Sequence, residues 1–483
     1  MKAAFSQLLD FLAPFGFPLI LVALAAGIAW LVRHHPVGAV IRNTVAQAIR
    51  VKAAFVIMLV YLVLVIAIPL LVKGDGTLAG QLHVVIAYSL IAAGVLLGIL
   101  TLAMSTTTLW SELHEKQIYL LESKPIHRWK ILLGKLLGIL TINAALLLFM
   151  ALVTWTCVAI LAGRGSWTQV DRFRANDQVL TARRVVPPVP DDVEKTVNDA
   201  YEDLKRLGRL PPNATEAAVK KQIKNEVVIS LNALRPRAYR HWRFAGLKHA
   251  RKPKAKATVT LRFRFACPVR DLGGNVHVGW ELGDPSTPFY TRGRGAYKPD
   301  EVHEEHIATN FITPEGNLDV RLHNIDGRNL LLIFTGKDAM QVLVPMAGFA
   351  SNLARGLWLI FIEVLFLAIL GLACSTFMSF PVSPVVAISV YLLIFLAASM
   401  QRELDQGLDL FDHKSRSQAT QAAEKAIRGV IVVIRHVLPP FDRYSASEPV
   451  SSGEEISWSI VLHAAFWVAI VRGESAMAWM VAR

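Results

Sequence analysis

Charged residues are scarce in this chain. Asp, Glu, Lys and Arg make up 18% of its 483 residues, against about a quarter in soluble domains. Acidic residues are the rarer kind, with 37 Asp and Glu against 51 Lys and Arg, and 53% of all residues are hydrophobic. This composition indicates a membrane protein. Its surplus of Lys and Arg is expected in cytoplasmic loops near anionic headgroups, and we predict no nucleic-acid partner.

Signatures of catalysis and of metal binding are also missing. Cys157, Cys267 and Cys374 lie far apart, so they form neither a disulfide framework nor a zinc spacing. The phosphate-loop pattern, the G-x-S-x-G pattern and the H-E-x-x-H pattern are all absent. The nearest metal-like cluster is His-Glu-Glu-His at 303–306. We expect a solvated strand there, with the two histidines on opposite faces; a helix would instead place both on one face as metal ligands. We predict no catalytic residue and no metal site.

Long apolar runs divide the chain, and about 20 apolar residues suffice to span a bilayer. The candidate spans are 14–32, 53–72, 84–108, 136–162, 356–380, 382–400 and, as the weakest, 456–481. Apolar residues at helical spacing beside Arg and Lys predict an interfacial helix at 37–52. Lys and Arg cluster in the loops that follow the first and third of these spans, so both loops are predicted to be cytoplasmic. The C-terminus is then cytoplasmic and the polar insert 164–352 is extracytoplasmic.

The insert 164–352 is predicted to be a folded α+β domain. Apolar residues fall on one helical face at 191–207 and at 215–234. The period then changes to two, as in Val259, Leu261 and Phe263, and strands are predicted at 258–265, 276–282, 318–323, 329–335 and 341–344. Several short half-buried strands at this spacing favour an antiparallel β-sandwich.

Ionisable residues interrupt two of the apolar runs. A carboxylate such as Glu363 costs about 3 kcal/mol or more inside a bilayer. It therefore faces a protein interior or a water-filled path, is protonated, or lies close enough to the outer interface to reach it. Arg472 and Glu474 either pair with each other, mark a break in the helix, or leave only 456–471 embedded. Glu363, Arg472 and Glu474 are candidates for an intramembrane polar site.

A charged, amphipathic segment at 112–130 separates two of the apolar spans. We predict a short helix ended by Pro125, with apolar contacts from Ile118, Tyr119 and Leu121. A chain that leaves the membrane, forms a short ordered surface and returns presents that surface to a partner.

The pattern E-x-x-E-K-Q-x-x-L-L-E-S-K-P-I-x-R-W-x-x-L-L-G-K from Glu112 to Lys135 resembles the loop after the second core span of ABC-2 type transporter permeases. The most similar subgroup is the multi-copper enzyme maturation permeases, typified by the nitrous-oxide reductase maturation permease. The stretch 37–52 resembles the elbow helix of that family. The stretches 374–384 and 438–444 resemble its turn between the fourth and fifth core spans and the segment before its last span.

The resemblance implies that 112–130 is a coupling helix that docks on a separate ATPase subunit. The implied docking residues are Glu112, Glu115, Lys116, Lys124, Pro125, Arg128 and Trp129. It also implies a homodimer of this chain with two ATPase subunits in a bacterial inner membrane. ATP and Mg²⁺ then belong to the partner, and this chain needs no cofactor. The span 14–32 and the insert 164–352 depart from the family pattern, so the substrate is not implied.

These inferences predict four parts: an extra N-terminal transmembrane segment (1–36), two halves of a membrane domain (37–163 and 353–483) and an extracytoplasmic domain (164–352). An outer amphipathic segment is expected at 405–443. The predicted fold class is thus a polytopic α-helical membrane protein, with a six-span core, an extra N-terminal span and a large α+β domain. The predicted function is that of the permease subunit of an exporter-like ABC-2 transporter, coupled to ATP hydrolysis in a separate ATPase subunit. One alternative is a membrane-anchored binding or scaffold protein that acts through 164–352 on an extracytoplasmic protein or polymer. A self-contained enzyme is the third hypothesis, without a site to support it.

Overall fold

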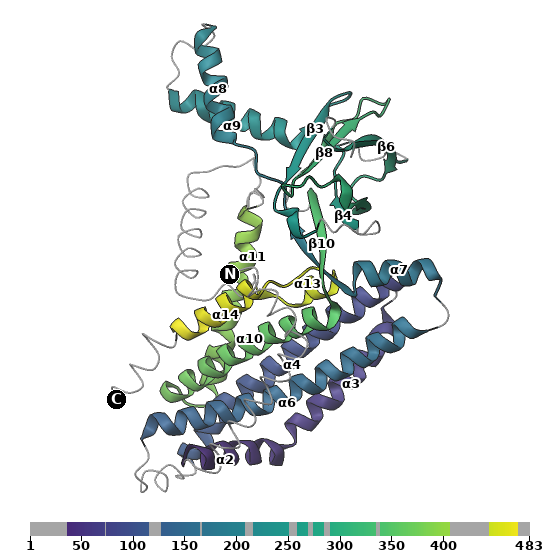
Figure 1. Cartoon of the computed structure of the whole chain (residues 1–483). Coiled ribbons are helices and arrows are strands. Elements are labelled where there is room, and N and C mark those ends of the chain that lie inside the picture. The colour runs from purple at the N-terminus through teal and green to yellow at the C-terminus, as the bar shows by residue number, and fades with distance from the viewer. Residues whose placement is uncertain are drawn as a thin grey trace. The chain divides into compact units, whose positions relative to one another are not determined.

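A computed structural model of the chain describes residues 36–72, 74–114, 127–164, 167–207, 216–250, 258–268, 274–284, 290–334, 339–405 and 444–471. The chain divides into two compact units (Figure 1). The helical unit is Met1–Ala182 together with Ala347–Arg483, and the β-rich unit is Arg183–Met346. Each unit has a hydrophobic core of its own.

The helical unit has long helices where apolar runs were predicted, together with shorter helices outside those runs. They are α2 (Pro36–Val51), α3 (Ala53–Leu71), α4 (Leu78–His114), α6 (Arg128–Gly163), α7 (Gln169–Gln178), α10 (Phe349–Phe377), α11 (Val382–Asp405), α13 (Ser447–Ser451) and α14 (Trp458–Val471). Within the described residues, four helices are long and apolar enough to cross a membrane: α3, α4, α6 and α10. Shorter apolar stretches lie in α11 and α14. These helices support a multi-pass membrane protein. The predicted span 14–32 lies outside the described residues.

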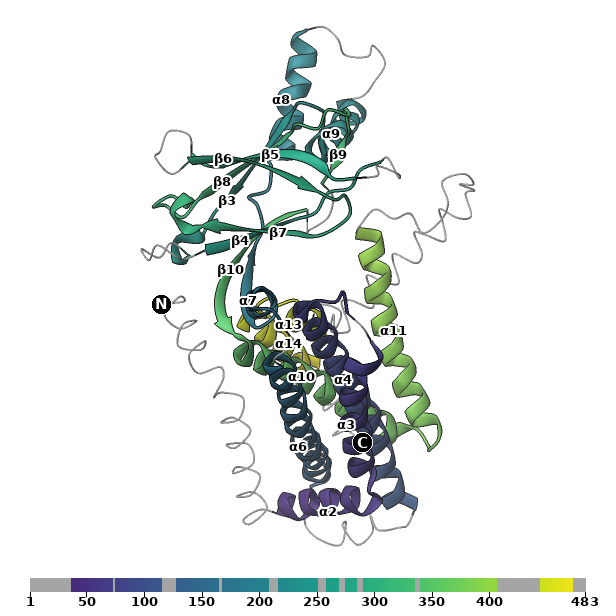
Figure 2. The ribbon, with the colours of Figure 1, turned by 90° about the vertical axis from the view of Figure 1, so that its right-hand side faces the viewer.

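Side chains from α3, α4, α6, α10 and α14 form one apolar cluster at the centre of the helical unit. In Figure 2, α2 lies across one end of α6. The apolar span predicted at 356–380 begins too late, because α10 starts at Phe349. Arg355 lies just before the predicted span, and the structure buries it in an ion pair with Glu455.

The β-rich unit contains two four-stranded sheets. One has the strand order β1-β10-β4-β7, from β1 (Thr181–Val186), β10 (Met340–Gly348), β4 (Thr258–Phe263) and β7 (His303–Ala308). The other has the order β3-β8-β5-β6, from β3 (Tyr239–Phe244), β8 (Leu318–Asn324), β5 (Val276–Gly283) and β6 (Tyr290–Tyr297). A short pair joins β2 (Ala233–Leu234) to β9 (Leu332–Ile333) antiparallel. Two single-turn helices, η1 (Leu247–His249) and η2 (Thr309–Phe311), lie between strands.

The two sheets form layers that share one core (Figure 2). Val259, Leu261 and Phe263 of β4 are at most 1% exposed, as their alternation predicts. Phe263 meets Trp280 of β5 from the other sheet, with their ring centroids 4.8 Å apart. Edge-to-face contacts of this kind add about 1 kcal/mol to the burial of the rings.

The two helices of the β-rich unit pack against each other. They are α8 (Val193–Arg206) and α9 (Glu216–Asn232), close to the predicted ranges 191–207 and 215–234. Their contact is a small separate cluster formed by Val197, Tyr201, Val219 and Ile223. Asp192 caps the start of α8, because its side chain accepts a hydrogen bond from the Lys195 amide, which satisfies a free amide of the first turn.

Candidate docking site and the helices that hold it

Helices α4 and α6 form an antiparallel hairpin joined by buried polar contacts. The Tyr61 hydroxyl of α3 lies 3.3 Å from the Ser89 carbonyl of α4 and 2.7 Å from the Thr154 hydroxyl of α6. The next contact joins Thr101 to Asn143, with 3.1 Å between Oγ1 and Oδ1. Polar side chains buried among apolar helices strengthen packing only when they are paired, and these pairs fix the register of the hairpin.

Lys135 forms the last of these contacts, nearest the segment 112–130. Its side chain is completely buried, and its Nζ donates a hydrogen bond of 3.1 Å to the Thr108 carbonyl. From Ser89 to Thr101 to Thr108 along α4, the opposite residues on α6 are Thr154, Asn143 and Lys135. The helices therefore remain aligned up to the end where α4 leaves for 115–126 and α6 begins.

Two glycines of α6 let α2 approach closely. A Cβ at Gly134 would lie 2.8 Å from Cβ of Val40, and one at Gly138 would lie 2.7 Å from Cβ of Thr44. Contacts below 3 Å are not tolerated between packed carbon atoms, so a larger residue would push the helices apart. The pattern Leu-Leu-Gly-Lys at 132–135 thus contributes both the close contact with α2 and the buried lysine.

The predicted docking residues fall around the ends of this hairpin. Glu112 is in the last turn of α4, and Arg128 and Trp129 are the first residues of α6. Trp129 is 44% exposed, and the Lys130 ammonium lies 5.7 Å from the centroid of its ring. Glu115, Lys116, Lys124 and Pro125 lie outside the described residues. The described part of the site is therefore its two helical borders, and the docking role stays a prediction.

The candidate intramembrane site is described only at Glu363. It lies at the middle of the 29-residue helix α10, and the Tyr391 hydroxyl of α11 donates a hydrogen bond to its carboxylate. Fourteen residues of helix correspond to about 21 Å, so the carboxylate is far from both ends of α10. The structure brings Glu363 together with a partner that the sequence argument did not name. Arg472 and Glu474 lie outside the described residues.

The sequence analysis missed a buried polar cluster at the start of α10. Arg355 is 0% and Glu455 is 3% exposed at the side chain, with 2.9 Å between Nη1 and Oε1. Arg355 Nη1 also donates to the Ile456 carbonyl at 2.9 Å. Asn352 donates to the Glu454 carbonyl at 2.7 Å and accepts from the Ile456 amide at 2.9 Å. Together these contacts fasten the chain before α14 to the first turns of α10. The available signal was an Asn and an Arg three residues apart, on one face of the helix.

The 303–306 cluster is a strand, as expected, but Glu304 is not solvated. Its side chain is 13% exposed and lies 3.0 Å from Arg183 and 2.9 Å from Arg262. Burial alone would raise the pKa of Glu304, but the two guanidinium groups outweigh burial and lower that pKa. Among the described residues, no group of three His, Cys, Asp or Glu side chains is arranged to hold a metal ion. Glu304 therefore neutralises the two guanidinium groups of Arg183 and Arg262.

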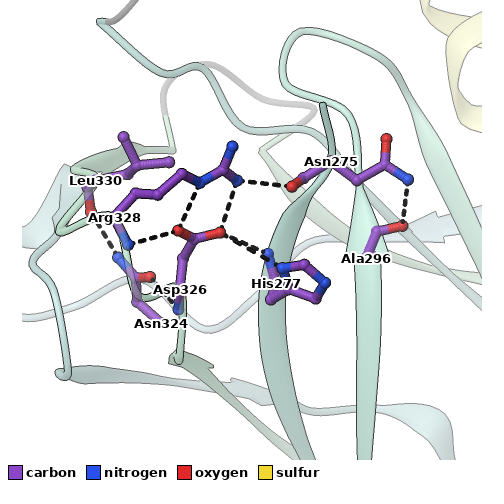
Figure 3. A network of polar contacts seen from close by, with 7 residues as sticks. All are labelled: Asn275, His277, Ala296, Asn324, Asp326, Arg328 and Leu330. Carbon is purple, nitrogen blue, oxygen red and sulfur yellow. Dashed lines mark hydrogen bonds and ion pairs between the residues drawn. The ribbon is translucent and has the colours of Figure 1, made fainter. Parts of the chain in front are cut away.

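A second polar network fixes the chain after β8 (Figure 3). Asp326, 1% exposed at the side chain, accepts hydrogen bonds from the amide and the Nε of Arg328, both at 2.9 Å. It also accepts one from the His277 amide at 3.1 Å. Arg328 in turn donates to the Asn275 carbonyl at 2.7 Å. The hydrogen bonds from Arg328 hold the pKa of Asp326 well below its usual range. A carboxylate satisfied in this way fixes a loop rather than reacting.

One family comparison gives a match. Residues 38–176 match the model of the ABC-2 family transporter protein, a range that contains α3, α4 and α6 with nearly all of α2 and most of α7. No curated protein and no solved structure matches the chain. The match does not reach α10, α11 or α14, and it does not distinguish the maturation subgroup. The first half of the helical unit is therefore similar to ABC-2 family transporter proteins, and this similarity supports the prediction of a membrane permease component.

Proposed function

We propose that the chain is the permease subunit of an exporter-like ABC-2 transporter, driven by a separate ATPase. The match of 38–176 to the ABC-2 family carries this proposal, because that range includes the hairpin that borders 112–130. The ATPase dimer would dock on the surface that begins at Glu112 and ends at Trp129. It would bind ATP and Mg²⁺, while this chain catalyses nothing.

The geometry of the hairpin supports a mechanical role for this docking surface. Lys135 ties the two borders of 112–130 together inside the bundle, and the contact between Thr101 and Asn143 continues the connection deeper. A displacement at the loop end would therefore move α4 and α6 as one body. Rigid-body movement of packed helices is the usual way in which a local event is passed across a protein.

The finer features of the proposal rest on the family resemblance and on the β-rich unit. We infer a homodimer in a bacterial inner membrane, of the maturation permease type, with Arg183–Met346 outside the membrane and the C-terminus in the cytoplasm. Two sheets around one core favour a β-sandwich for that unit. Such a unit has the surface to load or remodel an extracytoplasmic partner during the ATPase cycle.

The alternative function is a membrane-anchored binding or scaffold protein. The separate core of Arg183–Met346 favours this alternative, because a unit with its own core can bind a partner without any transport by the helices. In that case 112–130 would bind no ATPase, and the helices would serve as an anchor.

Co-purification from mild detergent distinguishes the two functions. Wild type, the variant Glu115→Arg/Arg128→Glu and the control Glu202→Arg/Arg206→Glu are purified through a tag and assayed for associated ATPase activity. The control makes the same double charge reversal on exposed positions of α8. We expect ATPase activity with wild type and control, and at least a tenfold loss with the docking variant. Absence of ATPase from all three would refute the permease proposal and favour the anchored module.

A further inference from the structure

The outer face of the sheet β3-β8-β5-β6 carries arginines and histidines in register. Trp242, Val320 and Val278 of this sheet point into the core, so their neighbours along each strand point away from it. We call this outer surface the arginine face. It consists of Tyr239, His241 and Arg243 on β3, Asp319, Arg321 and His323 on β8, Glu281 on β5, and Arg292 and Arg294 on β6.

One row of the arginine face crosses all four strands. In the strand register, His241 lies opposite Arg321, Arg321 lies opposite Glu281, and Glu281 lies opposite Arg292. Three strand spacings correspond to about 14 Å. In the rows beside it, Arg243 lies opposite Asp319 and Arg294 lies opposite Gly279. The face thus places separate cations near its two edges, on β3 and on β6.

The charges on the arginine face are unbalanced. Four arginines stand against two carboxylates, Asp319 and Glu281, before any histidine is protonated. Both carboxylates already have partners: Asp319 accepts from His241 at 2.7 Å and from Arg243 at 3.0 Å, and Glu281 lies 3.0 Å from Arg292 and 3.5 Å from Arg321. The arginine face therefore keeps a net positive charge that an anionic partner can neutralise.

The two edge arginines are held in a way that keeps their binding groups available. Arg243 donates to Asp319 through Nε, and Arg292 donates to the Tyr290 hydroxyl through Nε, which also lies 3.0 Å from the Glu281 carboxylate. Their side chains are 59% and 72% exposed. In the part of the chain that the structure describes, the terminal Nη groups of both arginines donate no hydrogen bond. A guanidinium fixed through Nε presents those two nitrogens as a fork that matches a carboxylate.

We propose that the arginine face binds an extended, acidic segment of a partner protein. Alternate residues of an extended chain lie about 7 Å apart on one side, so carboxylates four residues apart are separated by about 14 Å. That separation is close to the width of the row from β3 to β6. The exposed ring of Tyr239, 62% exposed and 5.3 Å from the His323 ring, adds apolar contact at the edge. Because the binding groups are exposed arginines, the affinity of the complex is expected to fall as the salt concentration rises.

The test uses the full chain in nanodiscs of zwitterionic lipid and a labelled peptide of alternating Glu and Thr. Binding is measured by fluorescence anisotropy for wild type, for Arg243→Gln/Arg292→Gln and for the control Lys221→Gln/Lys224→Gln on exposed positions of α9. We expect the arginine variant to lose at least tenfold in affinity and the control to remain within twofold of wild type. A peptide with Gln in place of Glu is expected not to bind.

Three results would overturn the proposal. They are equal affinities of the two double variants, binding of the Gln peptide as strong as that of the Glu peptide, and no peptide binding by wild type. Vesicles that contain anionic phospholipid, and an anionic polysaccharide, are tested beside the peptide. If either binds through Arg243 and Arg292 while the peptide does not, the face recognises that polymer or lipid instead of a protein. Unchanged tryptophan fluorescence of the variants verifies that they remain folded.

Discussion

Replacing Arg355 by methionine tests the buried ion pair at the start of α10. The substitution retains much of the volume of the side chain but removes the cation that lies 2.9 Å from Glu455. The Glu455 carboxylate, 3% exposed, then stays buried without this charge. Removal of one partner from a buried pair costs about 3–5 kcal/mol, because the desolvation of the other is no longer offset. This is a large share of a stability that is commonly about 5–15 kcal/mol.

The double variant Arg355→Met/Glu455→Met separates the ion pair from simple packing. Without either charge, the remaining loss is chiefly the hydrogen bond from Arg355 to the Ile456 carbonyl, about 1–2 kcal/mol. We therefore expect the double variant to be more stable than the single variant by about 2 kcal/mol. The exposed arginine Arg206, 80% exposed at the side chain, serves as the control, and Arg206→Met is expected to change stability by less than about 0.5 kcal/mol.

The assay is equilibrium unfolding in mixed micelles of increasing SDS content, followed by tryptophan fluorescence. It is carried out on wild type, the two single variants at 355 and 455, the double variant and the control. A cost below about 1 kcal/mol for Arg355→Met would refute the argument that burial makes this pair indispensable. The argument would also be refuted if the stability lost by the double variant equalled the sum of the losses of the two single variants, because the effects of independent sites are additive.

Three further predictions concern other contacts. Asp326→Asn is expected to destabilise the β-rich unit by about 2 kcal/mol at pH 7, measured by hydrogen exchange of β5 and β8 amides. Because the pKa of Asp326 is lowered in the folded state, its carboxylate contributes fully to stability above its unfolded-state pKa of about 4, and this contribution is lost as pH falls below that value. Asp326→Asn should therefore cost less stability at pH 3 than at pH 7, and an equal cost at both would contradict this reasoning. Gly138→Val is expected to separate α2 from α6, because a Cβ at this position would meet Thr44. A cysteine placed at the buried Ile41 should then react faster with a water-soluble maleimide than the same cysteine in a chain that keeps Gly138. Tyr391→Phe and Glu363→Gln are each expected to lower thermal stability by about 1–2 kcal/mol, and their combination should cost little more than either alone; additive losses would show that the two side chains act separately.

Periodicity predicted the elements whose two faces differ most. In β4 and in residues 318–323 of β8 each inward residue is apolar and each outward one is polar, so the alternation was visible before the structure. Strand β6, Tyr-Thr-Arg-Gly-Arg-Gly-Ala-Tyr, has no apolar alternation, because it is an edge strand with exposed arginines and glycines. Strand β7 was recognised as extended, yet the burial of Glu304 was not foreseen. Its arginine partners come from strands 42 and 121 residues away.

Helix positions were predictable in the same way, but the polar contacts between helices were not. Long apolar runs sufficed for α3, α4, α6 and α10. The partners of Glu363 and Arg355 lie 28 and 100 residues away along the chain, and nothing in the spacing of one helix names a residue on another. The pairing of Arg355 with Glu455 inside the protein was therefore not predicted. The docking residues came from the family resemblance alone, and only those at the borders of 112–130 are described.

The hydrogen bond of 3.0 Å from the Phe349 amide to the Leu180 carbonyl has a consequence for how this protein can be rebuilt. The chain leaves the helical unit just after Leu180 and returns just before Phe349, so both crossing points are immediate neighbours. About 170 residues are therefore inserted between two points that a short turn would bridge. Insertions of this kind leave the host fold intact when the ends lie close together. The β-rich unit can accordingly be excised, or exchanged for another domain with adjacent termini, while α7 and α10 keep their places.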